Sequence, residues 1–172
     1  MTEDRELRPV SRSSSELIRW MSIQDANSAG FVHGGVVMRM CDEVAGIAAI
    51  RHSGCRVVTA GMDRMTFTEP VHVGELLRCR ACVNAVWRTS MEVGVRVEAE
   101  NAVTAEVRHT STAYLTMVAV DERGEPIEVP RLIPETPDEE RRQREAETRR
   151  RNRLAEREEI LEARGAAGPA TG

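Results

Sequence analysis

Polar and apolar side chains alternate along four segments in the middle of the chain. The alternation is most regular in residues 91–99, where Val93, Val95 and Val97 fall on one face and Glu92, Arg96 and Glu98 fall on the other. Successive side chains of a strand point to opposite faces of a sheet, so this pattern predicts strands with one buried face. The predicted strands are 56–68, with a bend at Gly61, then 75–87, 91–99 and 106–120.

A different pattern precedes the strands. The run from Gly35 to Arg51 is apolar on almost every side and long enough for a helix, which is typical of a helix buried on most faces. Gly54 suits the left-handed position that ends many helices. Consecutive strands with short turns favour an antiparallel meander, whose apolar face the helix would cover. The sequence therefore predicts an α+β fold, with a curved antiparallel sheet wrapped around one central helix.

The two ends of the chain lack these patterns. Residues 1–14 are polar without periodicity and predict a flexible N-terminus, whereas residues 15–23 predict a first strand or a packing arm. Four prolines in residues 126–137 predict a linker without regular structure. The following Arg- and Glu-rich segment predicts a charged, solvated C-terminal helix with ion pairs four residues apart. The expected regions are a main domain at 15–130, the proline linker and charged helix at 131–164, and a disordered tail at 165–172.

Composition narrows the classes of function. The 172 residues carry a net charge of −4 and all 24 basic residues are arginine, which excludes any mechanism that needs a lysine and argues against a nucleic-acid binder. Neither a signal peptide nor a membrane-spanning run is recognisable, so we expect a cytoplasmic protein with reduced cysteines and no membrane partner. Cys79 and Cys82 are three residues apart in a predicted strand and would point to opposite faces, which suits neither a metal nor a disulfide.

Two acids interrupt the apolar helix and are candidates for chemistry. Asp42 lies two turns after Gly35 on the same face, and Glu43 lies on the neighbouring face. A carboxylate in a largely apolar helix must be paired, hydrated or functional, because burying it alone is prohibitive. The alternative for Asp42 is an ion pair with Arg39, three residues earlier. The residues alone do not decide between the two acids.

The loop before the helix supplies further candidates. Gly34 and Gly35 open the helix, where backbone N–H groups can polarise a carbonyl and stabilise an oxyanion, although a tight turn also requires glycine. Asn27 and His33 carry groups that donate or accept hydrogen bonds, and both residue types are also common in structural roles. No other catalytic sequence motif competes with this group of residues.

The stretch DANSAGFVHGGVVMRMCDEVAGIAA resembles the signature of the hotdog-fold acyl-CoA thioesterases, especially their cytosolic acyl-CoA hydrolase branch. In that family an Asn, a glycine, a Gly-Gly pair and an Asp seven residues later occur at this spacing. The similarity covers roughly residues 17–150. It continues through Val57-Val58-Thr59, Met65-Thr66-Phe67, Pro70-Val71, Val73-Gly74-Glu75, Arg88-Thr89-Ser90-Met91-Glu92-Val93 and Val118-Ala119-Val120-Asp121, and into the proline linker and Arg-rich tail.

The resemblance implies a role for each matched residue. Asp42 rather than Glu43 would be the general base or nucleophile, Asn27 would hold the water or the thioester, and the Gly35 N–H would polarise the thioester carbonyl. Thr89 and Ser90 match a segment near the family's active site, and Arg88 would contact a CoA phosphate. The residue before the glycine pair is often aromatic in the most similar branch. Here it is His33, which would either contact the carbonyl or replace that ring in packing.

The resemblance also implies an assembly. The family forms a double-hotdog homodimer, often three dimers in a hexamer, with active sites between protomers. The expected function is hydrolysis of acyl-CoA to a free acid and CoA, with no cofactor besides the CoA of the substrate and no metal. The alternatives are a 3-hydroxyacyl thioester dehydratase, for which His33 is the one nearby His base, and a non-catalytic acyl-CoA sensor whose charged tail is an interaction arm.

Overall fold

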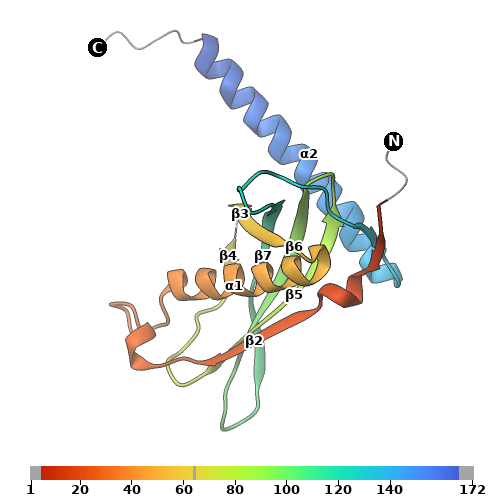
Figure 1. Cartoon of the computed structure of the whole chain (residues 1–172). Helices are drawn as coiled ribbons and strands as arrows, with labels where there is room; N and C mark the ends of the chain where they lie inside the picture. Colours follow the sequence, from red (N-terminus) through yellow and green to blue (C-terminus); the bar gives the residue numbers. More distant parts are fainter. Residues whose placement is uncertain (1–4, 64, 167–172) are drawn as a thin grey trace.

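A central helix, α1 (Gly34–Ser53), lies across the concave face of a curved antiparallel sheet (Figure 1). This arrangement comes from a computed structural model that describes residues 5–63 and 65–166. Val37, Cys41, Val44 and Ala48 recur at helical spacing and are at most 2% exposed. The helix ends where Gly54 adopts φ 73° and donates its N–H to the Ile50 carbonyl. The predicted buried helix and its glycine terminus are both confirmed.

The strands of the main sheet are β2 (Ser15–Trp20), β3 (Arg56–Met62), β4 (Thr66–Phe67), β5 (Leu76–Val86), β6 (Ser90–Glu100) and β7 (Val107–Val120). Their order in the sheet is β2-β5-β6-β7-β3, with β4 also paired to β7. Three consecutive strands, β5 to β7, form the predicted meander, but the first predicted strand lies beyond β7 rather than beside β5. The prediction of one simple meander is therefore wrong. Strand β2 already pairs with β5, so β7 offers the available edge for β3.

The two faces of the sheet carry different side chains. Val93, Val95 and Val97 face α1 and are at most 1% exposed, as their alternation predicts. A register shift interrupts the β3–β7 pairing between Thr59 and Gly61, where the bend is expected. Cys79 is buried in the core, whereas Cys82 is half-buried in a pocket that also contains residues of the C-terminal helix. Both cysteines are free thiols, as the sequence predicts.

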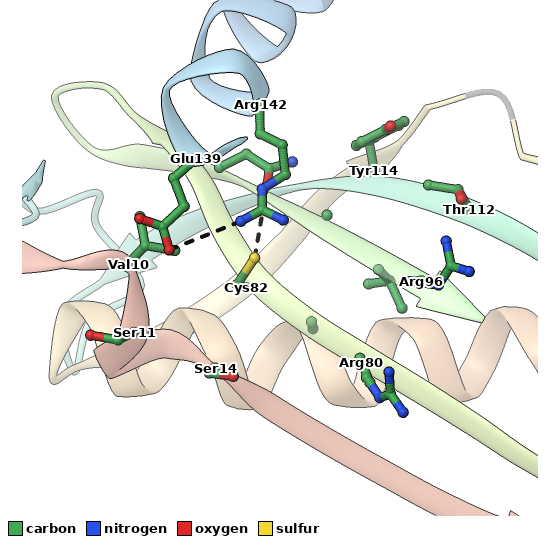
Figure 2. A pocket seen from close by; sticks show the side chains of 14 residues that line it. Val10, Ser11, Ser14, Arg80, Cys82, Arg96, Thr112, Tyr114, Glu139 and Arg142 are labelled. Carbon is green, nitrogen blue, oxygen red and sulfur yellow. Dashed lines mark hydrogen bonds and ion pairs between the residues drawn. The ribbon is translucent and has the colours of Figure 1, made fainter. Parts of the chain in front are cut away.

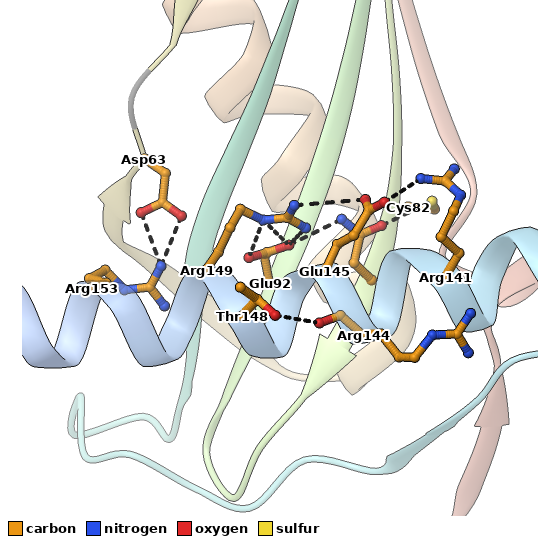
Figure 3. A network of polar contacts seen from close by, with 10 residues as sticks. Asp63, Cys82, Glu92, Arg141, Arg144, Glu145, Thr148, Arg149 and Arg153 are labelled. Atoms are coloured by element: carbon orange, nitrogen blue, oxygen red, sulfur yellow. Dashed lines mark hydrogen bonds and ion pairs between the residues drawn. The ribbon is translucent and has the colours of Figure 1, made fainter.

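The outer face of the sheet, opposite α1, contacts the first half of the C-terminal helix, α2 (Pro137–Ala166) (Figure 3). Arg149 of α2 donates from Nη2 to Glu92 of β6 at 2.6 Å, and its guanidinium lies 3.6 Å from the Tyr114 ring centroid. Arg153 pairs with Asp63 at 2.9 Å. A wholly solvated helix is therefore the wrong prediction for this half of α2, because Glu92 is fully buried beneath it. The predicted intrahelical pairs are present, as between Arg141 and Glu145 at 2.7 Å.

The segments expected to lack regular structure form a small second sheet. Strand β1 (Leu7–Pro9) pairs in parallel with β8 (Arg131–Ile133), and a 3₁₀ turn, η1 (Val10–Ser13), follows β1. The predictions of a flexible N-terminus and an unstructured linker are wrong for these residues. Prolines at 130 and 134 flank β8 without interrupting it, because proline is tolerated at strand ends.

The remaining terminal predictions fall largely outside the described residues. Residues 1–4 and 167–172 lie outside them, whereas residues 165 and 166 belong to α2 rather than to a disordered tail. Within residues 5–63 and 65–166, neither helix has the length and apolarity needed to cross a membrane.

Candidate active site

Asn27 lies in the loop that leads into α1. Its side-chain Oδ1 accepts hydrogen bonds from the N–H groups of Ala29 at 2.9 Å and Phe31 at 3.2 Å. Its own N–H donates to the Phe31 carbonyl at 2.7 Å. Oδ1 of the Asn27 side chain therefore stabilises the loop, as asparagine side chains often do in turns. Nδ2 of Asn27 has no hydrogen-bond partner among the described residues 5–63 and 65–166, so it can donate to a substrate or a water.

Asp25 holds the base of this loop and was not among the residues predicted from the sequence. Its carboxylate accepts from the Ser22 N–H at 2.8 Å and the Ser22 hydroxyl at 2.9 Å, and it pairs with Arg19. The Ser22 N–H is the main cause that holds the pKa of Asp25 below its usual range. The Asp25 carbonyl also accepts the His33 N–H at 2.7 Å. The Ser-x-x-Asp spacing is the sequence signal that predicts such a capping arrangement.

His33 caps the start of α1 with its imidazole ring. Nδ1 of the ring accepts the N–H of Gly35 at 3.0 Å. The N–H that we expected to polarise a carbonyl therefore donates to His33 in this structure, and its role toward the thioester stays a prediction. Gly34 lies against the ring of Phe67, since a Cβ added at Gly34 would stand 3.4 Å from Cζ of that ring. The glycine pair thus serves the close packing of the helix start.

Asp42 lies on the exposed side of α1 and is held by β3. The hydroxyl of Thr59 donates to Oδ1 of Asp42 at 2.6 Å. Arg39 pairs with Glu43 at 2.9 Å, so the expected alternative of an Arg39–Asp42 pair is not observed. Thr59 was missing from the predicted site because its contact with Asp42 exists only once β3 packs beside the helix. Asp42 is exposed, and among residues 5–63 and 65–166 its carboxylate has the Thr59 hydroxyl as its one hydrogen-bond partner, so within this part of the chain its second oxygen is available for chemistry.

Asp42 is separated from the other predicted catalytic residues, Asn27 and Gly35, within one chain. Asp42 lies seven residues beyond Gly35, which corresponds to about 10 Å along a helix. In the described part of the chain, no hydrogen bond joins the side chains of Asn27 and Asp42. One protomer therefore presents two halves of the predicted constellation rather than an assembled site.

Arg88, Thr89 and Ser90 lie at the turn between β5 and β6. The Arg88 side chain is 73% exposed, with its nearest described acid, Glu128, 4.0 Å away. The Thr89 carbonyl accepts the N–H of Ala119 at 3.0 Å. Strand register aligns Ser90 with Val118 of β7 and Val118 with Val58 of β3, so two strand spacings of about 4.8 Å separate Ser90 from β3. These three residues do not contact Asp42 within the described chain.

A cavity of about 530 Å³ lies between the outer face of the sheet and the start of α2, and Asp42 is not among its lining residues (Figure 2). Cys82, Arg96, Tyr114 and Arg142 contribute to its walls, and burial raises the pKa of the Cys82 thiol. None of the residues predicted for the site lines this cavity. The candidate site therefore lies instead on the opposite side, around the exposed Asp42.

Comparisons with known proteins agree with this fold. A model of the Thioesterase superfamily matches residues 29–106. The chain is 38% identical over 142 residues to the cytosolic acyl coenzyme A thioester hydrolase of Rattus norvegicus. That match covers 81% of this chain but 37% of the relative, so the chain spans little more than a third of that protein.

Solved structures match over more of their length. An apo-hexameric acyl-CoA thioesterase superimposes with a TM-score of 0.85 and 39% identity, covering 88% of this chain and 97% of that chain. An asparagine-to-alanine variant of the Staphylococcus aureus acyl-CoA hydrolase, in complex with coenzyme A, superimposes with a TM-score of 0.89 and 32% identity. This match covers 97% of this chain and 100% of that chain. Two other structures of that hydrolase carry alanine in place of an aspartate and of a threonine. The chain belongs to the thioesterase superfamily and has its hotdog fold, which confirms both the expected family and the expected architecture.

Proposed function

We propose that the chain hydrolyses acyl-CoA thioesters to a free acid and CoA. The observation that carries this proposal is the exposed Asp42 carboxylate, fixed by the Thr59 hydroxyl at 2.6 Å on the helix that follows the Asn27 loop. The rat relative is named an acyl-CoA thioester hydrolase, and the Staphylococcus aureus structure is a complex with coenzyme A. The cytosolic designation of the rat relative also supports a cytoplasmic location for this protein.

The residues substituted in the Staphylococcus aureus hydrolase support the choice of site. The asparagine, the aspartate and the threonine replaced there are separated by 15 and 17 residues. Asn27, Asp42 and Thr59 have the same types at the same intervals. This correspondence also favours Asp42 over its neighbour Glu43, whose carboxylate is paired with Arg39.

The geometry suggests a separate role in the reaction for each of these residues. Asp42 takes a proton from the attacking water and returns it to the CoA sulfur as the carbon–sulfur bond breaks. Alternatively, Asp42 attacks the carbonyl carbon directly and expels the CoA thiolate, which gives an anhydride; water then opens the anhydride, and its protons pass to the thiolate and the carboxylate. Thr59 donates to one oxygen of Asp42 and leaves the other to face the reacting atoms. Asn27 holds the water or the thioester through Nδ2. Gly34 and Gly35 provide the positive end of α1, where negative charge is stabilised, and no metal or additional cofactor enters the scheme.

We propose further that two chains share each site. Strand β3 is an edge strand, and its residues 58–61 are exposed in the single chain, so they can pack against a second copy. Asp42 of one protomer would then work with Asn27 of its partner, while Arg88, Thr89 and Ser90 bind the CoA part of the substrate. The hexameric thioesterase among the structural relatives supports a trimer of such dimers.

Thiol release from acyl-CoAs of graded chain length tests the proposed activity. The wild-type chain should turn over at least one of them, and Asp42→Ala should lower kcat by about 10²-fold or more, because it removes the acid–base or nucleophilic group. Glu43→Gln is the matched control, since it alters the adjacent acid of the same helix and should retain nearly full activity. Tight acyl-CoA binding without turnover by the wild-type chain would instead indicate a sensor.

A further inference from the structure

The cavity between the outer face of the sheet and the start of α2 contains three arginine side chains. Arg80 of β5 and Arg96 of β6 come from the sheet, whereas Arg142 comes from the second turn of α2 (Figure 2). Among the described residues that line the cavity, Glu139 is the one acid, and it lies 4.0 Å from Nη2 of Arg142. The wall therefore carries an excess of positive charge, although the whole chain has a net charge of −4.

The two arginines of the sheet lie directly opposite each other on neighbouring strands, because the register pairs Arg80 with Arg96. Like charges in this position repel each other and destabilise a sheet. Glu98 offsets part of the repulsion, since it accepts from Nε of Arg96 at 2.8 Å and lies 3.5 Å from Nη1 of Arg80. Within residues 5–63 and 65–166, neither Nη group of Arg96 has a hydrogen-bond partner. This pair therefore retains donors that a bound anion can use.

Arg142 adds a third guanidinium from the helical wall. Figure 2 shows it reaching from α2 toward Cys82 of β5. Its ion pair with Asp138, at 3.0 Å, joins side chains that are 35% and 57% exposed. Pairs this open to solvent contribute little, so an incoming anion can compete with Asp138 for Arg142. The hydroxyl of Tyr114, also in the wall, has no hydrogen-bond partner in the described part of the chain. Donors therefore line the cavity on both the sheet side and the helix side.

We propose that this cavity binds a small molecule that carries at least two phosphate or carboxylate groups. Arg80 and Arg96 hold one anionic group from the sheet, and Arg142 holds another from α2. The planar guanidinium fork matches both kinds of anion. A volume of about 530 Å³ is typical of a small-molecule site, and Asp42 is not part of the wall. Binding here is a second function of the chain, it does not depend on the proposed hydrolysis, and the bound molecule ties α2 to the sheet.

Calorimetric titration of the full chain with pyrophosphate, at constant ionic strength and without acyl-CoA, tests this binding. The wild-type chain should bind it saturably. Arg96→Met and Arg142→Met should each raise Kd by roughly tenfold or more, the contribution of one hydrogen bond to a charged group. Arg144→Met is the matched control, because this arginine of α2 is 70% exposed and outside the wall, and its Kd should equal that of the wild-type chain.

Two calorimetric results would overturn the proposal. One is the absence of saturable binding to the wild-type chain, both of pyrophosphate and of citrate, which stands for the carboxylate ligands. Binding of pyrophosphate alone identifies a phosphate ligand, and binding of citrate alone identifies a carboxylate ligand. The other is loss of binding in Arg88→Met with none in Arg142→Met, because the anion would then occupy the residue expected to contact CoA. Neither result bears on the hydrolysis of acyl-CoA.

Alkylation of the cysteines locates the bound anion without any substitution. Cys82 lines the cavity, whereas Cys55 is also half-buried but lies outside the wall, so one chain contains both probe and control. Peptide mass spectrometry after treatment with iodoacetamide measures the two rates. Pyrophosphate at ten times its Kd should slow the alkylation of Cys82 by about elevenfold, because the unoccupied fraction alone reacts, and should leave Cys55 unchanged. Saturable binding with no protection of Cys82, or equal slowing at Cys55, would contradict the assigned site.

Discussion

The buried ion pair between Arg149 and Glu92 predicts a large loss of stability when Arg149 is replaced by methionine. The Glu92 side chain is 0% exposed, and Arg149 donates to its two oxygens at 2.6 and 3.1 Å. The Arg149→Met variant would leave the carboxylate with the Asn84 amide, at 3.2 Å, as its one remaining described partner. Removing one member of a buried pair costs about 3–5 kcal/mol, because the other charge stays buried without compensation.

Urea and thermal unfolding measure this loss. For a domain of this size each kcal/mol corresponds to roughly 2–4 °C, so the unfolding midpoint of Arg149→Met should fall by about 6–20 °C. The double variant Glu92→Gln/Arg149→Met should recover much of the loss, since it removes the buried charge as well. Arg141→Met is the matched control on the same helix. Its pairs with Asp138 and Glu145 are exposed, so its effect should be much smaller.

The stabilities of Arg149→Met and Arg141→Met, compared with each other, test whether the buried charge of Glu92 causes the loss. Equal losses for Arg149→Met and Arg141→Met would refute it, because the buried contact would then be no stronger than an exposed one. Failure of the double variant to recover stability would show that the loss comes from side-chain packing, including the contact with Tyr114, rather than from an unpaired charge.

Three further predictions concern the site and its support. Asp25→Asn should lower kcat by roughly tenfold and should add little in an Asn27→Ala background, because Asp25 acts by positioning the loop; additive losses in thiol release would contradict this. Thr59→Val should lower kcat by about tenfold with little change in KM, since it removes the hydroxyl donor to Asp42 while keeping the side-chain shape; an unchanged kcat would count against the contact. Burial lowers the pKa of His52, so the unfolded chain binds a proton more readily, and stability contributed by the neutral ring should decrease as the pH falls below about 6.5. The loss of unfolding free energy between pH 7.5 and 5.5 should be smaller in His52→Gln than in the wild-type chain, and equal losses would contradict the assignment.

Local patterns were sufficient to predict the elements but not all of their neighbours. The run from Gly35 to Arg51 and the glycine at 54 give α1 almost residue by residue, because burial and the helix terminus are both local signals. The position of β3 beyond β7 depends on the competing pairing of β2 with β5, which no periodicity reports. The contact of Arg149 with Glu92 joins residues 57 positions apart, so the charged helix gave no sign of its buried face.

In the candidate site, too, the residues close together in sequence were predictable, whereas the contacts that depend on the fold were not. The Asn27 loop, the glycine pair and Asp42 were recognisable because their spacing lies within sixteen residues of sequence. The residues alone left Asp42 and Glu43 equal, and the hydroxyl of Thr59 distinguishes them only when β3 lies beside α1. The ring of His33 was a candidate for contact with substrate or for packing, and its bond with Gly35 became evident only from the geometry of the helix start.

Mixed oligomers of two inactive variants test the central claim that Asp42 of one chain works with Asn27 of its partner. Asp42→Ala and Asn27→Ala chains should each have little activity alone. When equal amounts are unfolded and refolded together, about half of the dimers contain both variants, and each of these has one intact site of two. Thiol release from acyl-CoA should then recover to about one quarter of the wild-type value. No recovery in a mixture shown to contain such dimers would contradict the shared site.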